Sequence, residues 1–422
     1  MIRKKLIIML FALTLCSNVF CQWDKYFIDK TLRIDYSHSG HVGVDYFNIN
    51  ELQELDFYAG NHNFLFDKTN NGAYMVALLE KETGKMIFSK GVSSLYNEWL
   101  STKEALTTCG NFEEVALVPM PKENIDVQIA FYVRDSVNNF KEINRQDLDR
   151  NKIMPCNSKK CNIIILNETN HKMQNRVDLT LIPVGYTMEE KNKMLNDLHN
   201  MNDYIFSQEP YKSKKDRIQI TAVERYSKVS GIPGLKDRKN EIGDLGVTYN
   251  TFSSPRYIMT QNLWDLYDVI NTVPTDAIIL VCNGSVYGGG GIYNYYATCY
   301  IGDKSREVIV HEFSHSFVGL GDEYSDNDSD AGVTNANLEP YEKNITTLVN
   351  FKDKWEKMIS PDTPIPTPLT EKYKDKIGVF EGAAYMAKGF YRPYEHCIMR
   401  DLTPFCPVCT KAINEIIDLH CN

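Results

Sequence analysis

The residues with the clearest chemical potential are His311, Glu312 and His315, in the run His311-Glu312-Phe313-Ser314-His315. A helix places residues four apart on one face, so the two imidazoles can bind one metal ion. Histidine nitrogens suit zinc, at bond lengths of about 2.0–2.1 Å. Glu312 projects beside such a metal, where it can hold a water molecule and accept its proton. The pattern predicts a hydrolytic zinc site whose metal-bound water is activated by Glu312.

A third metal ligand is expected just beyond this helix. Ser305 is expected to cap the helix, Glu307 favours its first turn, and Gly319 can end it in a left-handed conformation. Asp322 and Glu323 follow, and a turn at Gly319 can bring a carboxylate back to the histidines. Three protein ligands leave the fourth position of zinc to water, as catalysis requires. Asp322 is favoured because it is shorter, and Glu323 is the alternative ligand or a brace for a ligating histidine.

Strands that alternate with helices must position this site. Thr187-Met188-Glu189-Glu190 is a capping box that opens a helix, and Ala277–Cys282 is apolar enough for a central strand. Residues 288–291 are four glycines without a following Lys-Ser/Thr, so they predict a flexible rim of the active-site cleft and not a phosphate loop. These patterns predict an α/β catalytic domain over residues 168–422, with further strands expected at Val177–Val184, Arg217–Val223 and Tyr295–Ile301.

Residues 22–150 have the pattern of an all-β, sandwich-like domain. Short apolar or alternating runs are separated by turn signals such as Asn70-Asn71-Gly72, and the runs include Thr31–Tyr36, Tyr74–Leu79 and Val127–Val133. Nothing in this region has a catalytic pattern. A polar stretch with Pro155 and two cysteines follows, so residues 151–167 are expected to link the two domains.

The composition is that of an ordinary soluble globular protein. The chain has 422 residues, of which 43% are hydrophobic and 24% are charged. The formal net charge of −9 disfavours a nucleic-acid partner, which would require a basic face.

Residues 1–21 have the pattern of a secretory signal peptide. Three basic residues, Arg3 to Lys5, precede the apolar run Leu6–Leu15, which is too short to span a membrane. Cleavage after Cys21 removes three cations and no anions, which changes the charge from −9 to about −12. The protein is therefore expected to be secreted or periplasmic, without a membrane span. Lipid attachment at Cys16 is the alternative, although Leu15 is larger than the residue preferred before a lipidated cysteine.

Nine cysteines follow Cys21, and in an exported protein they are expected to form disulfides with at least one thiol left over. The run Cys406-Pro407-Val408-Cys409 is half of a zinc ribbon, but the sequence has no second such pair. A disulfide or an unpaired thiol is therefore favoured at this position.

An acidic run follows the histidine helix. Asp326, Asp328 and Asp330 alternate like the ligands of a calcium loop, but Ala331 stands where an EF-hand needs glycine. This departure favours a solvated acidic loop.

The spacing of the metal-site residues resembles that of a known family. In metzincins, the HExxH helix is stopped by glycine three residues after the second histidine, and the third ligand comes six after. Here Gly319 and Asp322 come four and seven residues after His315. This longer form, HExxHxxxGLxDEY with a later Cys397-Ile398-Met399-Arg400, resembles the IgA-peptidase-type family of bacterial zinc metallopeptidases. The segments Val177–Thr187 and Gly378–Ala383 are also similar to that family's catalytic domain.

The resemblance implies a metzincin-like catalytic domain preceded by a β-rich domain. It covers most of the mature chain, and it is specific from His311 to Tyr324 and loose before Val177. It implies one catalytic zinc held by His311, His315 and Asp322, with Glu312 as base and Met399 beneath the metal.

The sequence names no residue for stabilising the oxyanion. Some metzincins use a tyrosine two residues after the methionine, where this chain has Asp401. Tyr391 and Tyr394 are the nearby candidates.

The function predicted from these residues is that of a secreted zinc endopeptidase acting on a protein or peptide. The family name suggests immunoglobulin A as substrate, although no residue pattern here indicates specificity for its hinge. A cell-surface binding protein with a structural zinc is the alternative. Structural sites usually have four protein ligands and are rich in cysteine, whereas this one has three candidates and a glutamate placed for catalysis. The enzyme is therefore favoured.

Overall fold

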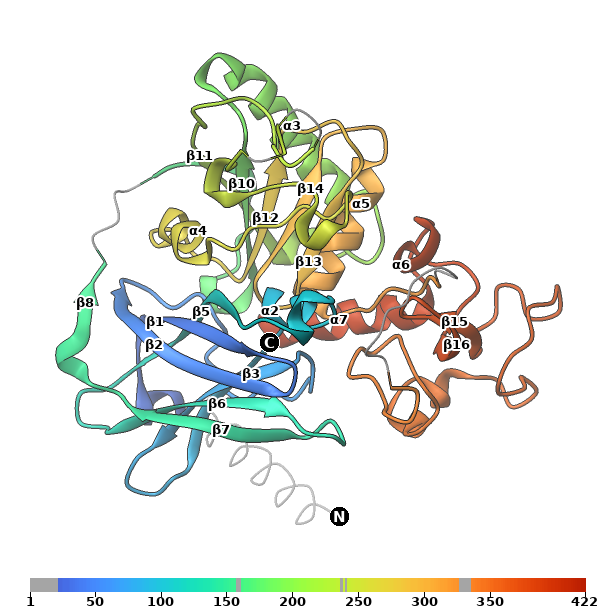
Figure 1. Cartoon of the computed structure of the whole chain (residues 1–422), viewed down its shortest axis with the longest axis horizontal. Coiled ribbons are helices and arrows are strands. Elements are labelled where there is room, and N and C mark those ends of the chain that lie inside the picture. The colour runs from blue at the N-terminus through green and yellow to red at the C-terminus, as the bar shows by residue number, and fades with distance from the viewer. Residues whose placement is uncertain (1–21, 157–160, 236–237, 240, 326–334) are drawn as a thin grey trace, which may run out of the picture.

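The computed structural model describes residues 22–156, 161–235, 238–239, 241–325 and 335–422 (Figure 1). The signal peptide predicted at 1–21, the alternative lipid site Cys16 and the acidic run from Asp326 to Asp330 lie outside these residues. Within the described ranges, no helix combines the length and apolarity needed to cross a membrane.

The N-terminal region is built from two four-stranded sheets that pack face to face. Phe131 lies between the sheets, with its ring centroid 4.9 Å from that of Tyr36 and 4.8 Å from that of Phe47. The predicted β-rich character of this region is therefore confirmed. In spatial order, one sheet comprises β5 (Gly110–Pro121), β1 (Phe27–His41), β2 (Val44–Leu55) and β8 (Ile153–Pro155), and the other comprises β4 (Met86–Val92), β3 (Tyr74–Glu80), β6 (Val127–Arg134) and β7 (Phe140–Asp147).

The second region contains a mixed six-stranded sheet. Its four inner strands are parallel, and an antiparallel strand closes each edge. Strands β10 and β12 are buried along their whole length, as expected of continuous apolar runs covered on both faces. In spatial order the strands are β13 (Gly289–Ile292), β14 (Tyr296–Tyr300), β12 (Ala277–Cys282), β10 (Val177–Val184), β11 (Ile218–Glu224) and β9 (Asn162–Asn167).

Helices flank this sheet and a hairpin lies beyond it (Figure 1). The predicted capping box at Thr187 is present and opens the turn that leads into α3. These helices are α3 (Lys191–Ile205), α4 (Leu263–Ile270), α5 (Ser305–Phe313), α6 (Ile398–Asp401) and α7 (Pro407–Cys421), and the hairpin comprises β15 (Phe380–Ala383) and β16 (Met386–Arg392). A further short helix, α2 (Leu95–Trp99), belongs to the N-terminal region. A π-helical turn, η9 (Ser314–Val318), continues α5, and short 3-10 turns are η1 (Glu104–Leu106), η2 (Arg150–Lys152), η3 (Met173–Asn175), η4 (Met188–Glu190), η5 (Lys215–Arg217), η7 (Asp244–Gly246), η8 (Thr251–Ser253), η10 (Phe351–Asp353) and η11 (Glu356–Met358).

Three local predictions differ from the structure. The glycines expected to form a flexible rim are mostly strand, because residues 289–292 pair with β14 and so satisfy their backbone groups. Ser305 does not cap α5: it is the first helical residue, and Lys304 precedes it. Two strands lie inside the predicted linker, since β8 pairs with β2 and β9 pairs with β11.

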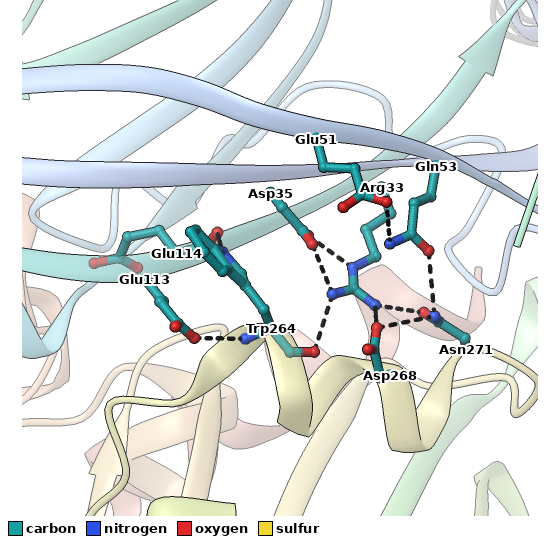
Figure 2. Close-up of polar contacts among 9 residues, drawn as sticks. All are labelled: Arg33, Asp35, Glu51, Gln53, Glu113, Glu114, Trp264, Asp268 and Asn271. Atoms are coloured by element: carbon teal, nitrogen blue, oxygen red, sulfur yellow. Dashed lines mark hydrogen bonds and ion pairs between the residues drawn. The ribbon is translucent and has the colours of Figure 1, made fainter. Parts of the chain in front are cut away.

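A buried arginine joins the two regions. Arg33 of β1 is fully buried and makes a bidentate pair with Asp35, at 2.7 and 2.8 Å. The same guanidinium donates to Asp268 of α4, to Asn271 directly after that helix and to the carbonyl of Trp264, at 2.6, 2.9 and 3.0 Å (Figure 2). Because a planar guanidinium holds several acceptors in one geometry, this network fixes α4 against the first sheet.

The first turn of α4 is also bound by the neighbouring strand β5. Glu113 accepts a hydrogen bond from the backbone N–H of Trp264 at 3.0 Å, and the indole of Trp264 donates to the carbonyl of Glu114 at 3.2 Å. A helix start leaves N–H groups without helical partners, so the N-terminal region supplies a cap that the helix itself lacks.

Candidate active site

The two histidines of the predicted motif lie together at the end of α5. His311 is in the last turn of α5, and His315 lies in the π-helical turn that continues it. The rings are nearly perpendicular, and their Nε2 atoms are 3.0 Å apart. A helical turn widened in this way is common at functional sites and still places both side chains on one face.

Backbone carbonyls orient both imidazoles. His311 Nδ1 lies 2.9 Å from the carbonyl oxygen of Ile398, and His315 Nδ1 lies 2.6 Å from that of Leu320. Each Nδ1–H can therefore donate to a fixed acceptor, which selects the tautomer whose Nε2 carries a lone pair. Both lone pairs then point to the same position.

Asp322 completes this group. Gly319 ends the turn with φ of 73°, as predicted, and the chain returns so that Asp322 Oδ1 lies 3.2 Å from the Nε2 atom of both His311 and His315. Among the described residues this buried oxygen has no hydrogen-bond partner. Ligands at about 2.0–2.1 Å from a tetrahedral zinc ion lie roughly 3.3 Å from one another, so the three atoms fit such an ion.

The electrostatics of the three residues favour a cation. Burial lowers the pKa of His315, but attraction to Asp322 outweighs burial and raises that pKa to about 9. The same attraction holds the pKa of Asp322 well below its usual range. A permanent carboxylate charge therefore faces the two imidazoles, where a metal ion or protons can balance it.

Glu312 lies beside this position. Its carboxylate is within 4.8 Å of ligand atoms of both histidines. Burial raises the pKa of Glu312, and the two histidines oppose that rise. Strand β13 passes directly against the residue: a Cβ atom on Gly289 would lie 2.8 Å from Glu312 Oε1, and one on Gly291 would lie 2.5 Å from the Glu312 carbonyl oxygen. Glycines are thus required where the edge strand meets the helix.

Met399 lies in the segment that supports His311. The residue is fully buried, its neighbour Ile398 accepts from His311, and its own carbonyl accepts from the N–H of Glu323 at 2.8 Å. The predicted methionine segment is therefore brought to the back of the histidine helix.

Glu323 does not face the histidines. It is fully buried, and its Oε1 accepts from Asn344 Nδ2 at 2.9 Å and from the thiol of Cys409 at 3.1 Å. Its carboxylate makes no hydrogen bond to His311 or His315, so the structure gives no support to the alternative that Glu323 braces a ligating histidine.

Tyr385 is a site residue that the sequence analysis missed. Its hydroxyl donates to Asp322 Oδ2, and Tyr324 donates to it at 3.2 Å. Ala384 and Tyr385 both have positive φ, 51° and 65°, and the Ala384 N–H donates to the Asp322 carbonyl at 2.9 Å. Strained backbone of this kind persists where surrounding contacts demand it. The sequence did offer one indication: Tyr385 closely follows the segment Gly378–Ala383, which resembles the family's catalytic domain.

The two tyrosines suggested by the sequence, Tyr391 and Tyr394, are partly buried and contact the hydrophobic core. The Tyr391 backbone pairs with Thr346.

The N-terminal region also reaches the site. Asn71, in the predicted turn between strands, donates through Nδ2 to the carbonyl of Val318 at 2.9 Å. That carbonyl belongs to the last turn of the histidine helix, where the backbone lacks helical partners. This region, which has no catalytic pattern in sequence, thus caps the element that carries His315.

Tyr385→Phe is expected to weaken metal binding at Asp322 by about 10–100-fold, the usual cost of losing a partner that orients a ligand. The substitution removes only the hydroxyl that holds Asp322 Oδ2. Competition with a chelator of known affinity measures the effect, and Tyr391→Phe is the matched control. Equal metal affinity in both variants would show that this hydroxyl does not orient Asp322.

Two family models match the chain. One, described as Peptidase M64 N-terminus, matches residues 22–144, and the other, described as IgA Peptidase M64, matches residues 164–376 and 369–417. A comparison with curated proteins finds no match. The first match covers the two packed sheets except β8 and the end of β7, and the second covers most of the mixed sheet and His311, Glu312, His315 and Asp322. With more than half of its length matched by the catalytic model, the chain belongs to the IgA Peptidase M64 family.

Proposed function

We propose that this protein is a zinc-dependent endopeptidase that hydrolyses peptide bonds of a protein substrate. The observation that carries the proposal is the convergence of three potential ligand atoms, at 3.0–3.2 Å from one another, beside the carboxylate of Glu312. Membership of a peptidase family supports the same reaction class.

In this proposal, His311, His315 and Asp322 hold the metal. The chemistry that zinc supplies when bound is polarisation of the scissile carbonyl and a water pKa lowered to about 7. Glu312 accepts the proton of the attacking water and returns it to the leaving amine. Burial raises the pKa of Glu312 above that of a free glutamate, which makes its carboxylate a better proton acceptor.

A metal ion with four protein ligands would indicate a structural role instead of a catalytic one. The three facing atoms belong to three side chains, and Glu312, whose carboxylate lies within 4.8 Å of ligand atoms of both histidines, is assigned here as the base and not as a ligand. We therefore favour the enzyme over the surface binding protein. We place the enzyme outside the cytoplasm on the signal pattern of residues 1–21, and immunoglobulin A is the substrate that the family's description suggests.

Removal of the metal is expected to abolish hydrolysis, and added zinc is expected to restore it. Turnover of a broad fluorogenic peptide library would be measured before treatment with a chelator, after it, and after zinc is returned. A class-specific serine peptidase inhibitor serves as the control for contaminating activity. Full turnover by protein verified to be metal-free would rule out a zinc peptidase. A metal-loaded protein that binds peptides but cleaves none would favour the surface binding protein.

A further inference from the structure

A second cluster of potential metal ligands lies behind the first. One ligand atom from each of Glu323, Cys397, Cys406 and Cys409 lies within 4.8 Å of the others, and all four residues are buried. They come from three separate places: the loop after the histidine helix, the residue before α6, and the start of α7.

Backbone amides donate to two of the sulfurs. The N–H of Cys406 points to Cys397 Sγ and that of Cys409 points to Cys406 Sγ, each at 3.4 Å. Cys406 is also the N-cap of the 15-residue helix α7. Amide donors and the positive end of a helix both stabilise a thiolate, which is the form of cysteine that binds metals.

The carboxylate in this cluster has an incomplete set of partners. Glu323 is fully buried, and among the described atoms its Oε2 has no hydrogen-bond partner. Removing a carboxylate from water without a compensating charge is strongly unfavourable. A cation at the centre of the cluster would compensate this charge.

We propose that Glu323, Cys397, Cys406 and Cys409 bind a second zinc ion, with a structural role. Three sulfurs and one oxygen form a closed, cysteine-rich set of four protein ligands, which is characteristic of structural zinc sites. Thiolate-rich tetrahedral sites select soft or borderline cations over magnesium or calcium. The inference goes beyond the proposed peptidase activity and does not depend on it.

A disulfide explains fewer of the observations. It joins only two sulfurs, at about 2.05 Å, and so would leave a third thiol and the Glu323 carboxylate buried together. In the structure none of Cys397, Cys406 and Cys409 forms a disulfide, in contrast to the disulfides expected from sequence. The pair Cys406 and Cys409 is therefore completed by distant residues and not by a second pair of the same pattern.

The second ion would fix the positions of the segments that support the first metal site. Glu323 directly follows Asp322, and its N–H donates to the carbonyl of Met399, two residues after Cys397. The intervening Ile398 orients His311. One structural ion would thus tie together the loop of Asp322, the methionine segment and α7.

The test is the metal content of the purified full chain after mild desalting, by elemental analysis. Wild-type protein is expected to hold two zinc ions per chain. His315→Ala and Cys409→Ser should each hold one. Cys421→Ser, at the other end of α7, is the matched control and should hold two. Should Cys409→Ser not fold, Glu323→Gln takes its place.

A second readout follows the cysteine thiols and the metal spectrum directly. Cys397, Cys406 and Cys409 should resist alkylation in native protein and react after chelation without any reductant, as followed by peptide mass spectrometry. Cobalt in place of zinc should give strong thiolate-to-metal absorption that His315→Ala retains and Cys409→Ser loses.

The outcomes separate the two sites. A single zinc that His315→Ala removes and Cys409→Ser keeps would overturn the second site and leave the proposed peptidase intact. A disulfide between any two of the three cysteines in native protein would also overturn it. A single zinc that only Cys409→Ser removes would support the second site and count against the catalytic one.

Discussion

Glu312→Gln is expected to lower peptide hydrolysis by about 10²–10⁴-fold, the usual contribution of a positioned general base, while leaving the metal content unchanged. The amide keeps the size of the side chain but cannot accept the proton of the attacking water. Strand β13 makes size important here, because a Cβ atom on Gly289 would already lie 2.8 Å from Glu312 Oε1. Initial rates on a peptide library, with elemental analysis of the same sample, would measure both effects.

Glu307→Gln is the matched control for this variant. Glu307 lies in the first turn of the same helix, so the same chemical change is made away from the histidines. It should retain nearly full activity. Near-normal turnover by Glu312→Gln would contradict the assignment of Glu312 as the base, and loss of metal from it would assign the carboxylate a structural part in the site.

The features predicted from sequence are those encoded locally. Strands β10 and β12 appear at the predicted residues because continuous apolar runs suit buried parallel strands. The pairing of His311 with His315 follows from helical spacing, and the return of Asp322 follows from the left-handed stop at Gly319.

The features missed by the sequence analysis depend on tertiary contact. Tyr385 lies 63 residues from Asp322, Cys409 lies 86 from Glu323, and Asn71 lies 247 from Val318. No local pattern marks such partners, since each becomes meaningful only when the fold brings it to the site. The glycine run was misjudged for the same reason: glycine favours loops in isolation, whereas β14 and the close approach of α5 make these residues an edge strand.

Asp322→Ala is expected to weaken binding of the catalytic metal by more than the 10–100-fold that loss of an orienting partner costs. It removes the carboxylate oxygen that lies 3.2 Å from each of the two Nε2 atoms. It also removes the largest of the interactions that raise the pKa of His315, while burial continues to lower that pKa. Protons would therefore compete less for His315 near neutral pH, and the lost affinity would report the missing ligand.

Glu323→Ala is the informative comparison, because the adjacent carboxylate is fully buried but points to Cys409 and Asn344. Chelator titration followed by recovery of hydrolysis reports the catalytic ion alone, whereas total zinc reports both proposed ions. Asp322→Ala should lose the catalytic ion and keep the other. Glu323→Ala should lose the ion bound by the cysteines and show a smaller decrease in catalytic affinity, transmitted through the Glu323–Met399 backbone bond. If Glu323→Ala loses the catalytic ion while Asp322→Ala retains it, the roles of the two carboxylates must be reversed. The short distances from Asp322 Oδ1 to the two histidines would then reflect an ion pair and not a set of metal ligands.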